Sequence, residues 1–336
     1  MSMTPRDRVI TSLQHKQPDK TPYAVGFTQP AYAKMAEFYG DPDFGAGLGN
    51  CLTAIGAGPH LPWVETTPGV WEDPFGVQWN RTVDKDIGVV CNTRVTPETL
   101  EAYTFPDFDD ARYGADFRAF TAAHPDLFRI ADLGFSLFER AWTLAGMETL
   151  LMAMVDEPAF AHRLLDRILE FNLRAIAKAC AHDVDAMMFG DDWGQQTGVL
   201  MGAPLWREFI KPRVGQMYAA AKARGKAVFI HSCGKVDSLF PDLIELGLDV
   251  FNPFQPEVMD VYAMKRTYGD RLSFYGGIST QRTLPYGTPQ ETRDEVRRLL
   301  DEIGKDGGYL AAPAHSIPGD AKPENIAAML EVLQGQ

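Results

Sequence analysis

Short apolar runs alternate with longer stretches of helical spacing from about residue 126 to the end of the chain, and this alternation restricts the fold most. The apolar runs are LFRIADLG, DAMMFGDDWG, AVFIHSCG, LDVFNPF, LSFYGGIST and GGYLAAPAHS. Strands that are apolar throughout and separated by single helices are typical of a parallel sheet buried on both faces. With TPYAVGF near the N-terminus as a first strand, the count and the length favour an α/β fold of the closed (β/α)8 TIM-barrel type over an open doubly wound sheet.

Capping signals and apolar spacing support the helices between these strands. Thr288 and Glu291 form a capping-box start, after which apolar residues recur at i, i+3, i+4 and i+7 as far as Ile303. The same criteria predict helices over residues 158–181, 204–224, 236–246, 258–268, 289–303 and 324–333.

Residues 40 to 110 do not follow this alternation. GVWEDPFGVQWNRTV alternates and turns like a β-hairpin, with Phe75 and Gly76 near its bend, and TFPDFDD has the composition of a loop. We interpret this part as an N-terminal β-hairpin insertion near the barrel mouth, within one domain over residues 1–336. An independent small domain is the alternative, but its apolar content would be thin.

Composition excludes several classes of protein. The chain has 336 residues, 45% of them hydrophobic, and its four cysteines have no paired spacing, so we expect free thiols and a cytoplasmic location. The N-terminal MSMTPRDRVITSLQ is charged where a signal peptide would be apolar, and no apolar run approaches the ~18 residues that span a bilayer. The formal net charge of −13, without a basic cluster, argues against nucleic acid or an anionic membrane as a partner.

Polar side chains end five of the predicted strands, where the loops of such a barrel build the active site. His231 and Cys233 are two residues apart at the end of one strand, so they project to the same side. His315 ends the last strand, which barrel closure brings back toward that pair. Zinc accepts thiolate and imidazole ligands, and three protein ligands with an open fourth position are typical of a catalytic site. We therefore predict a zinc site at His231, Cys233 and His315; packing of a strand-end histidine and a buried thiol is the alternative.

Three carboxylates at strand ends are candidate catalytic residues. Asp191 and Asp192 could serve as a general base, a substrate anchor or a further metal ligand, or one of them could cap a helix N-terminus. Glu139 could lie beside the metal, or it could pair with its neighbour Arg140.

Trp193, Asn252 and Gln255 are candidate substrate-binding residues. Trp193 could line a mouth that accepts aromatic groups, although an aromatic residue at such a position is at least as often part of the core. Asn252 and Gln255 suit polar contacts to a ligand, although Asn-Pro is also ordinary turn chemistry.

Several segments resemble the uroporphyrinogen decarboxylase superfamily, and within it the zinc- and corrinoid-dependent methyltransferase branch. They are FGDDWGQQTGVLMGAPLWREFIKPR, FIHSCGKV, LDVFNPFQPE, KRTYGDRLSFYGGISTQRTLPYGTPQETRDEVRR and GGYLAAPAHSIPGDAKPENIAAM. The resemblance, which runs from about Thr4 to Met329, implies a (β/α)8 barrel and two zinc ligands in the HxCG element, here His231 and Cys233. It also implies a corrinoid (cobalamin) cofactor carried by a partner protein.

The chain departs from this branch at the third ligand. Methylcobamide:thiol methyltransferases of this group usually carry a cysteine before the last helix, where this chain has APAHS, so His315 takes the cysteine's position. One thiolate and two neutral imidazoles leave a Zn²⁺ site with a net charge of about +1, which makes it a stronger Lewis acid toward oxygen or nitrogen. We therefore expect a methyltransferase of the O-demethylase type, which moves a methyl group from a small methylated substrate, foremost a methoxylated one, to a Co(I) corrinoid protein.

A second departure concerns the decarboxylases of the superfamily. They carry an Arg-Gln-Ala-Gly-Arg element after the first strand, whereas PYAVGFTQPAYAKM here has no arginine, which disfavours tetrapyrrole decarboxylation. The alternatives left open are a metal-independent decarboxylase acting on a smaller acid, a methyltransferase from a methylcorrinoid to a thiol or folate, and a binding protein without catalysis. Barrels of this group often pair, so a homodimer is a further expectation.

Overall fold

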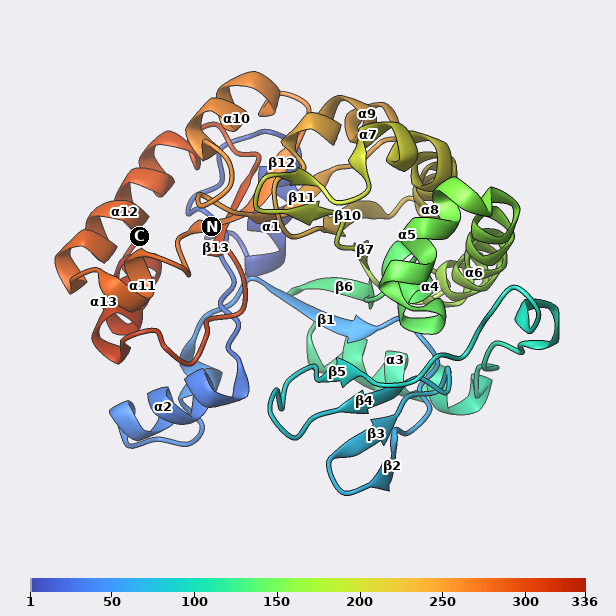
Figure 1. The fold of residues 1–336 in the computed structure, drawn as a ribbon. Helices are drawn as coiled ribbons and strands as arrows, with labels where there is room; N and C mark the ends of the chain where they lie inside the picture. The colour runs from blue at the N-terminus through green and yellow to red at the C-terminus, as the bar shows by residue number, and fades with distance from the viewer. Residues whose placement is uncertain (1) are drawn as a thin grey trace.

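Seven parallel strands form the central sheet in the computed structural model, which describes residues 2–336 (Figure 1). They pair in chain order: β1 (Leu52–Gly56), β6 (Phe128–Leu133), β7 (Ala186–Gly190), β10 (Ala227–His231), β11 (Val250–Phe254), β12 (Ser273–Ile278) and β13 (Tyr309–Pro313). Residues 22–27 close the ring, because the Ala311 amide donates to the Pro22 carbonyl at 2.9 Å and the Cys51 amide donates to the Tyr23 carbonyl at 2.8 Å. The predicted (β/α)8 TIM barrel is therefore confirmed, with an irregular segment where TPYAVGF was expected to form the first strand.

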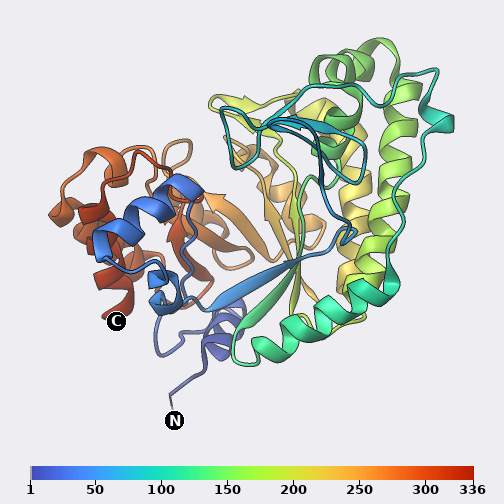
Figure 2. The same cartoon turned by 90° about the horizontal axis from the view of Figure 1, so that it is seen from below.

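Helices cover the outside of the barrel strands (Figures 1 and 2). They are α1 (Pro5–Leu13), α2 (Gln29–Tyr39), α3 (Asp110–Ala123), α4 (Phe138–Ala145), α5 (Met147–Asp156), α6 (Pro158–Ala179), α7 (Gly202–Leu205), α8 (Lys211–Lys222), α9 (Phe240–Glu245), α10 (Val261–Tyr268), α11 (Thr283–Tyr286), α12 (Pro289–Glu302) and α13 (Pro323–Gln334). The capping box predicted for α12 is present, with Thr288 and Glu291 each accepting from the other's backbone amide. Within residues 2–336, no helix combines the length and the apolar character needed to cross a membrane.

The sequence did not predict β1, the first barrel strand after the closing segment. β1 lies inside the stretch 40–110 that we assigned to an insertion, so that assignment was too long. Its five residues are half-buried or exposed, unlike the continuously buried β11 and β13, and no α-helix follows it until α3. The true insertion occupies the connection between β1 and α3.

That insertion contains the predicted hairpin and extends it to a four-stranded antiparallel sheet of β2 (Val64–Thr67), β3 (Val70–Glu72), β4 (Gln78–Asn80) and β5 (Val89–Val90). The β3–β4 turn contains Phe75 and Gly76, as predicted, and Gly76 has a positive φ of 75°. Asp73 fixes the turn, since its carboxylate accepts from the backbone amides of Phe75 and Val77. In Figure 2 this sheet and the N-terminus lie at opposite ends of the barrel strands.

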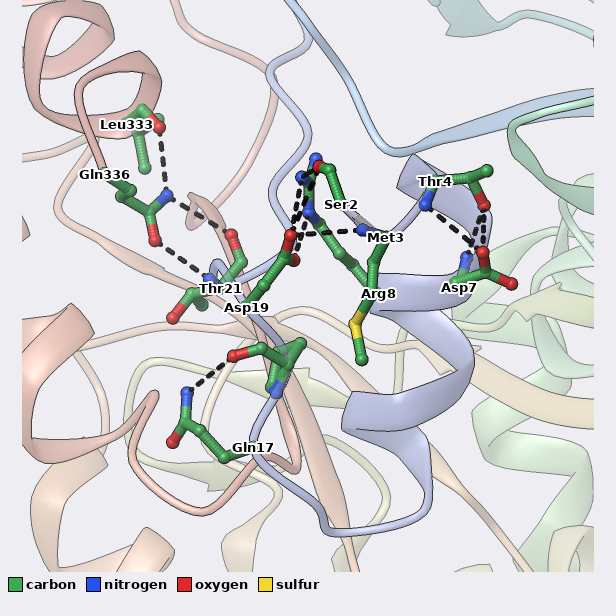
Figure 3. Close-up of polar contacts among 11 residues, drawn as sticks. Ser2, Met3, Thr4, Asp7, Arg8, Gln17, Asp19, Thr21, Leu333 and Gln336 are labelled. Atoms are coloured by element: carbon green, nitrogen blue, oxygen red, sulfur yellow. Dashed lines mark hydrogen bonds and ion pairs between the residues drawn. The ribbon is translucent and has the colours of Figure 1, made fainter.

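The N-terminal helix covers the end of the barrel far from the insertion. Val9 of α1 is buried in one cluster with side chains of the barrel interior, among them Phe128, Phe229 and Leu310. Close by, the Asp19 carboxylate accepts from the Arg8 guanidinium, and the Gln336 side chain exchanges two hydrogen bonds with the Thr21 backbone (Figure 3). Both ends of the chain are thus fastened on the side opposite the candidate site.

Candidate metal centre

The structure brings His231, Cys233 and His315 together at the carboxyl ends of β10 and β13. One ligand atom from each residue lies within 4.8 Å of the other two, and Cys233 Sγ is 3.4 Å from His231 Nε2. Zinc–nitrogen and zinc–sulfur bonds of about 2.0–2.3 Å at tetrahedral angles place ligand atoms roughly 3.5 Å apart. The donor set and the Cys233–His231 distance therefore fit a zinc ion with an open fourth position.

A hydrogen bond behind the ligands fixes the orientation of one imidazole. His231 Nδ1 donates to Asn252 Oδ1 at 2.6 Å, which leaves the Nε2 lone pair directed at the Cys233 side. Asn252 is itself held, because its Nδ2 donates to the Tyr275 carbonyl at 3.0 Å. Such outer contacts select the tautomer of a metal-binding histidine and orient its ring. Asn252, predicted as a substrate contact, thus holds the candidate ligand His231, and it also lines the adjoining cavity.

The turn that carries Cys233 is held from two sides. The Cys233 amide donates to Asp192 Oδ1 at 2.8 Å, and the Gly234 amide donates to Gln255 Oε1 at 2.8 Å. Gln255, the other predicted polar substrate contact, is buried and serves this turn. Asp192 also lies 3.9 Å from His231 Nε2 and keeps 38% of its side chain exposed, so it faces the site.

Protonation of the ligands follows from their burial. Desolvation raises the pKa of the Cys233 thiol, and the nearby Asp192 and Glu139 carboxylates raise it further. Burial, then His231, lowers the pKa of His315, which keeps that imidazole neutral and able to bind a metal. A cation must therefore displace a proton from Cys233, and its binding is expected to strengthen as the pH rises.

Asp191 has a supporting position. Its buried carboxylate accepts from the Glu139 amide at 2.8 Å at the start of α4 and from Trp193 Nε1 at 2.6 Å. Burial raises the pKa of Asp191 to about 6, against the hydrogen bonds that favour its ionised form. This is the helix-capping alternative of the sequence analysis, applied to a neighbouring helix.

Trp193 lies in the core, although we predicted a place at the mouth. Its side chain is fully buried and packs edge-on against Trp206 with ring centroids 5.2 Å apart. The bond to Asp191 satisfies the indole N–H, which allows the ring to be buried.

Glu139 lies in the first turn of α4 near the two aspartates. Burial raises its pKa well above the ordinary value, and the Asp192 and Asp191 carboxylates raise it further, which favours the protonated form of Glu139. Its neighbour Arg140 pairs with Asp73 of the insertion at 3.1 Å, so the predicted alternative of a Glu139–Arg140 pair gives way to this contact. Glu139 is a carboxylic acid able to give up a proton beside the ligand group.

The sequence analysis did not identify Asp132 of β6 as a site residue. Burial raises the pKa of Asp132 to about 6, while the nearby His231 lowers it. An acidic residue on the same strand face as the apolar Phe128 and Ile130 is the signal that could have revealed it.

Two glycines permit close approach of the turns after β7 and β10. A Cβ added to Gly234, which has a φ of +87°, would lie 2.4 Å from the Gly194 carbonyl carbon. We expect Gly234→Ala to shift Cys233 and to weaken zinc binding about 10- to 100-fold, as loss of an outer-shell support does. Gly225→Ala is the matched control, since its φ is +71° but no atom lies within 4 Å of the added Cβ. Zinc affinities by competition with a chromogenic chelator check this, and equal affinities for the two variants would contradict it.

Comparison with known proteins identifies the family of the chain and supports its fold. The family model for uroporphyrinogen decarboxylase (URO-D) matches residues 134–335. A uroporphyrinogen decarboxylase of Methylococcus capsulatus is 24% identical over 180 residues, which are 54% of this chain and 50% of the relative. The methylated-thiol--coenzyme M methyltransferase of Methanosarcina mazei is 23% identical over 163 residues, 48% of this chain and 42% of the relative. The chain thus spans about half the length of these two curated relatives or less.

A solved structure described as a methyltransferase from Methanosarcina mazei superposes with a TM-score of 0.74 at 17% identity and covers 99% of both chains. This likeness shows that the two proteins share a fold over nearly their whole length.

Proposed function

Because the chain belongs to the uroporphyrinogen decarboxylase family, we propose that it is a zinc-dependent methyltransferase that moves a methyl group from a small methylated molecule to a Co(I) corrinoid on a partner protein. The observation that carries this proposal is the His231, Cys233 and His315 group, whose ligand atoms lie within 4.8 Å of one another. One relative described as a methyltransferase supports the same class of reaction, and a solved structure with that description shares the fold.

The three ligands would hold the zinc, which supplies Lewis acidity toward the heteroatom that carries the methyl group. A donor set of one thiolate and two imidazoles suits an oxygen or nitrogen atom, so a methoxylated donor is the first candidate. The methyl carbon passes to cobalt, and the heteroatom keeps the electron pair of the broken bond.

Residues of this chain supply the proton for the departing heteroatom and hold the candidate ligands in position. The protonated Glu139 gives its proton to the departing heteroatom, and Asp192 holds the Cys233 turn in place through the backbone amide. Asp191 has its oxygens occupied by the Glu139 amide and the Trp193 indole, so we assign it a positioning role.

A metal-independent decarboxylase acting on a small acid is the competing function, and the decarboxylase relatives favour it. Recognition of a carboxylate usually employs arginine or lysine. Neither residue lines the cavity beside the ligand group, within the described part of the chain. That observation favours the methyltransferase over the decarboxylase.

Zinc-loaded protein should convert a reduced corrinoid to its methylated form when a methoxylated donor is added. The change in the cobalt absorbance spectrum measures this conversion. Removal of zinc by a chelator should abolish the reaction, and added zinc should restore it. Activity that persists without metal and without corrinoid would support the decarboxylase instead.

Glu139→Gln belongs to the same experiment. We expect a rate about 100-fold lower with unchanged zinc content, because the amide cannot donate a proton to the leaving atom. Glu148→Gln in the first turn of the next helix, where the side chain is exposed, should leave the rate unchanged.

A further inference from the structure

A cavity of about 180 Å³ extends from His231 and His315 into the barrel interior. Its walls come from several strands and are mainly apolar, with Ala54, Ile130 and Met188 among the lining side chains, and Asn252 and Ser316 add polar groups. The volume equals about six water molecules, which is room for a small molecule or for one end of a larger one. This cavity is the space next to the ligand group that a substrate could fill.

Asp132 lies on the interior side of β6. It follows Ile130 by two residues, so both side chains project to the same face of the strand, and Ile130 lines the cavity. In register, Asp132 is paired with Met188 of β7, another lining residue, and with Gly56 of β1, which has no side chain to cover it. The Asp132 carboxylate forms no hydrogen bond or ion pair with any residue of the range 2–336.

Tyr275 of β12 supplies a second polar group to the same interior. It lines the cavity, and its hydroxyl has no hydrogen-bond partner among the described residues. The carboxylate of Asp132 is near enough to contribute to the raised pKa of Tyr275, after the larger effect of burial. Two half-buried polar groups without side-chain hydrogen bonds inside residues 2–336 thus lie on the interior face of the barrel, one lining the cavity and the other on the same strand face as the lining residue Ile130, where each is free to bond to a ligand.

We propose that Asp132 and Tyr275 form a recognition subsite for the end of the substrate opposite its methylated heteroatom. The subsite takes a group that donates a hydrogen bond, either a hydroxyl or an ammonium. It rejects a carboxylate, because Asp132 repels an anion and no lysine or arginine lines this cavity. The inference rests on the proposed function only for the placement of the methylated end at the ligand group.

Calorimetric binding to the zinc-loaded protein, without corrinoid, tests the subsite apart from the reaction. The probes are methoxybenzene, 4-methoxyphenol, 4-methoxybenzylamine and 4-methoxybenzoate, which share the methoxy end and differ at the other. We expect the phenol and the amine to bind about tenfold more tightly than methoxybenzene, and the benzoate to bind most weakly.

Two variants assign the preference to the named residues. Asp132→Asn should remove most of the preference for the amine and should allow the benzoate to bind more tightly. Tyr275→Phe should weaken the binding of the phenol about threefold. Asp126→Asn is the matched control, since Asp126 is exposed near the opposite end of the same strand.

Equal affinities for all four probes, the absence of measurable binding, or preferences unchanged in Asp132→Asn would overturn the subsite. Selective binding without methyl transfer would leave the subsite standing and refute the proposed function, so the two failures are distinguishable.

Discussion

Cys233→Ala is expected to abolish stoichiometric zinc binding and to lower methyl transfer by about a thousandfold. Cys233 is the only thiolate in the ligand group, and its sulfur lies 3.4 Å from His231 Nε2. The variant loses the ligand that neutralises half of the zinc charge, and two neutral imidazoles remain. Lewis-acid polarisation contributes several kcal/mol to such a step, and about 4 kcal/mol corresponds to the thousandfold loss.

Zinc content by mass spectrometry of the purified protein checks the first part, and the cobalt absorbance assay checks the second. Cys91→Ser is the matched control, because Cys91 is an exposed free thiol in the insertion, outside the ligand group. If Cys233→Ala keeps a full equivalent of zinc and normal turnover, the proposed metal centre is incorrect.

Arg140→Met should lower the free energy of unfolding by about 3–5 kcal/mol. Arg140 and Asp73 form an ion pair at 3.1 Å with 9% and 2% of their side chains exposed, so the substitution leaves a carboxylate buried without its counter-charge. The guanidinium also lies 3.8 Å from the centre of the Phe75 ring, a contact that methionine replaces only in part. The free energy of unfolding of native proteins is about 5–15 kcal/mol, so this loss is a large fraction of the stability.

Urea unfolding followed by circular dichroism measures this change. Arg163→Met is the matched control, because its ion pair with Glu101 is 50% and 67% exposed and should contribute less than about 1 kcal/mol. Equal unfolding free energies for the two variants would show that the buried pair does not fasten the insertion.

Most of the fold could be predicted because most barrel strands are much more apolar than the segments around them. β11 and β13 are buried at every residue, and such continuous apolar runs identify a strand within a parallel sheet. β1 has no such contrast, because its residues alternate between half-buried and exposed. The closing segment around Tyr23 was recognised by composition, but its irregular pairing with Ala311 depends on contacts across the whole chain.

The candidate site could be predicted as far as chain order determines it. Strand ends of a parallel barrel meet at one face, so His231, Cys233 and His315 were expected there, and the structure brings them together. The roles of the surrounding polar residues depend on which atoms meet, which the sequence does not specify. The Asn252 side chain bonds to His231 and the Trp193 indole bonds to Asp191, contacts that only the folded structure shows.

The insertion between β1 and α3 supplies none of the three ligands, which come from the turns after β10 and β13. Its contacts with the segment around Glu139 include the pair of Asp73 with Arg140, the residue next to Glu139, and the packing of Trp79 on Phe135. The reactive side chains and the segment that covers their approach therefore belong to different parts of the chain. The connection after β1 can therefore change in length or sequence, and so change which molecules reach the candidate site, while His231, Cys233 and His315 stay in place.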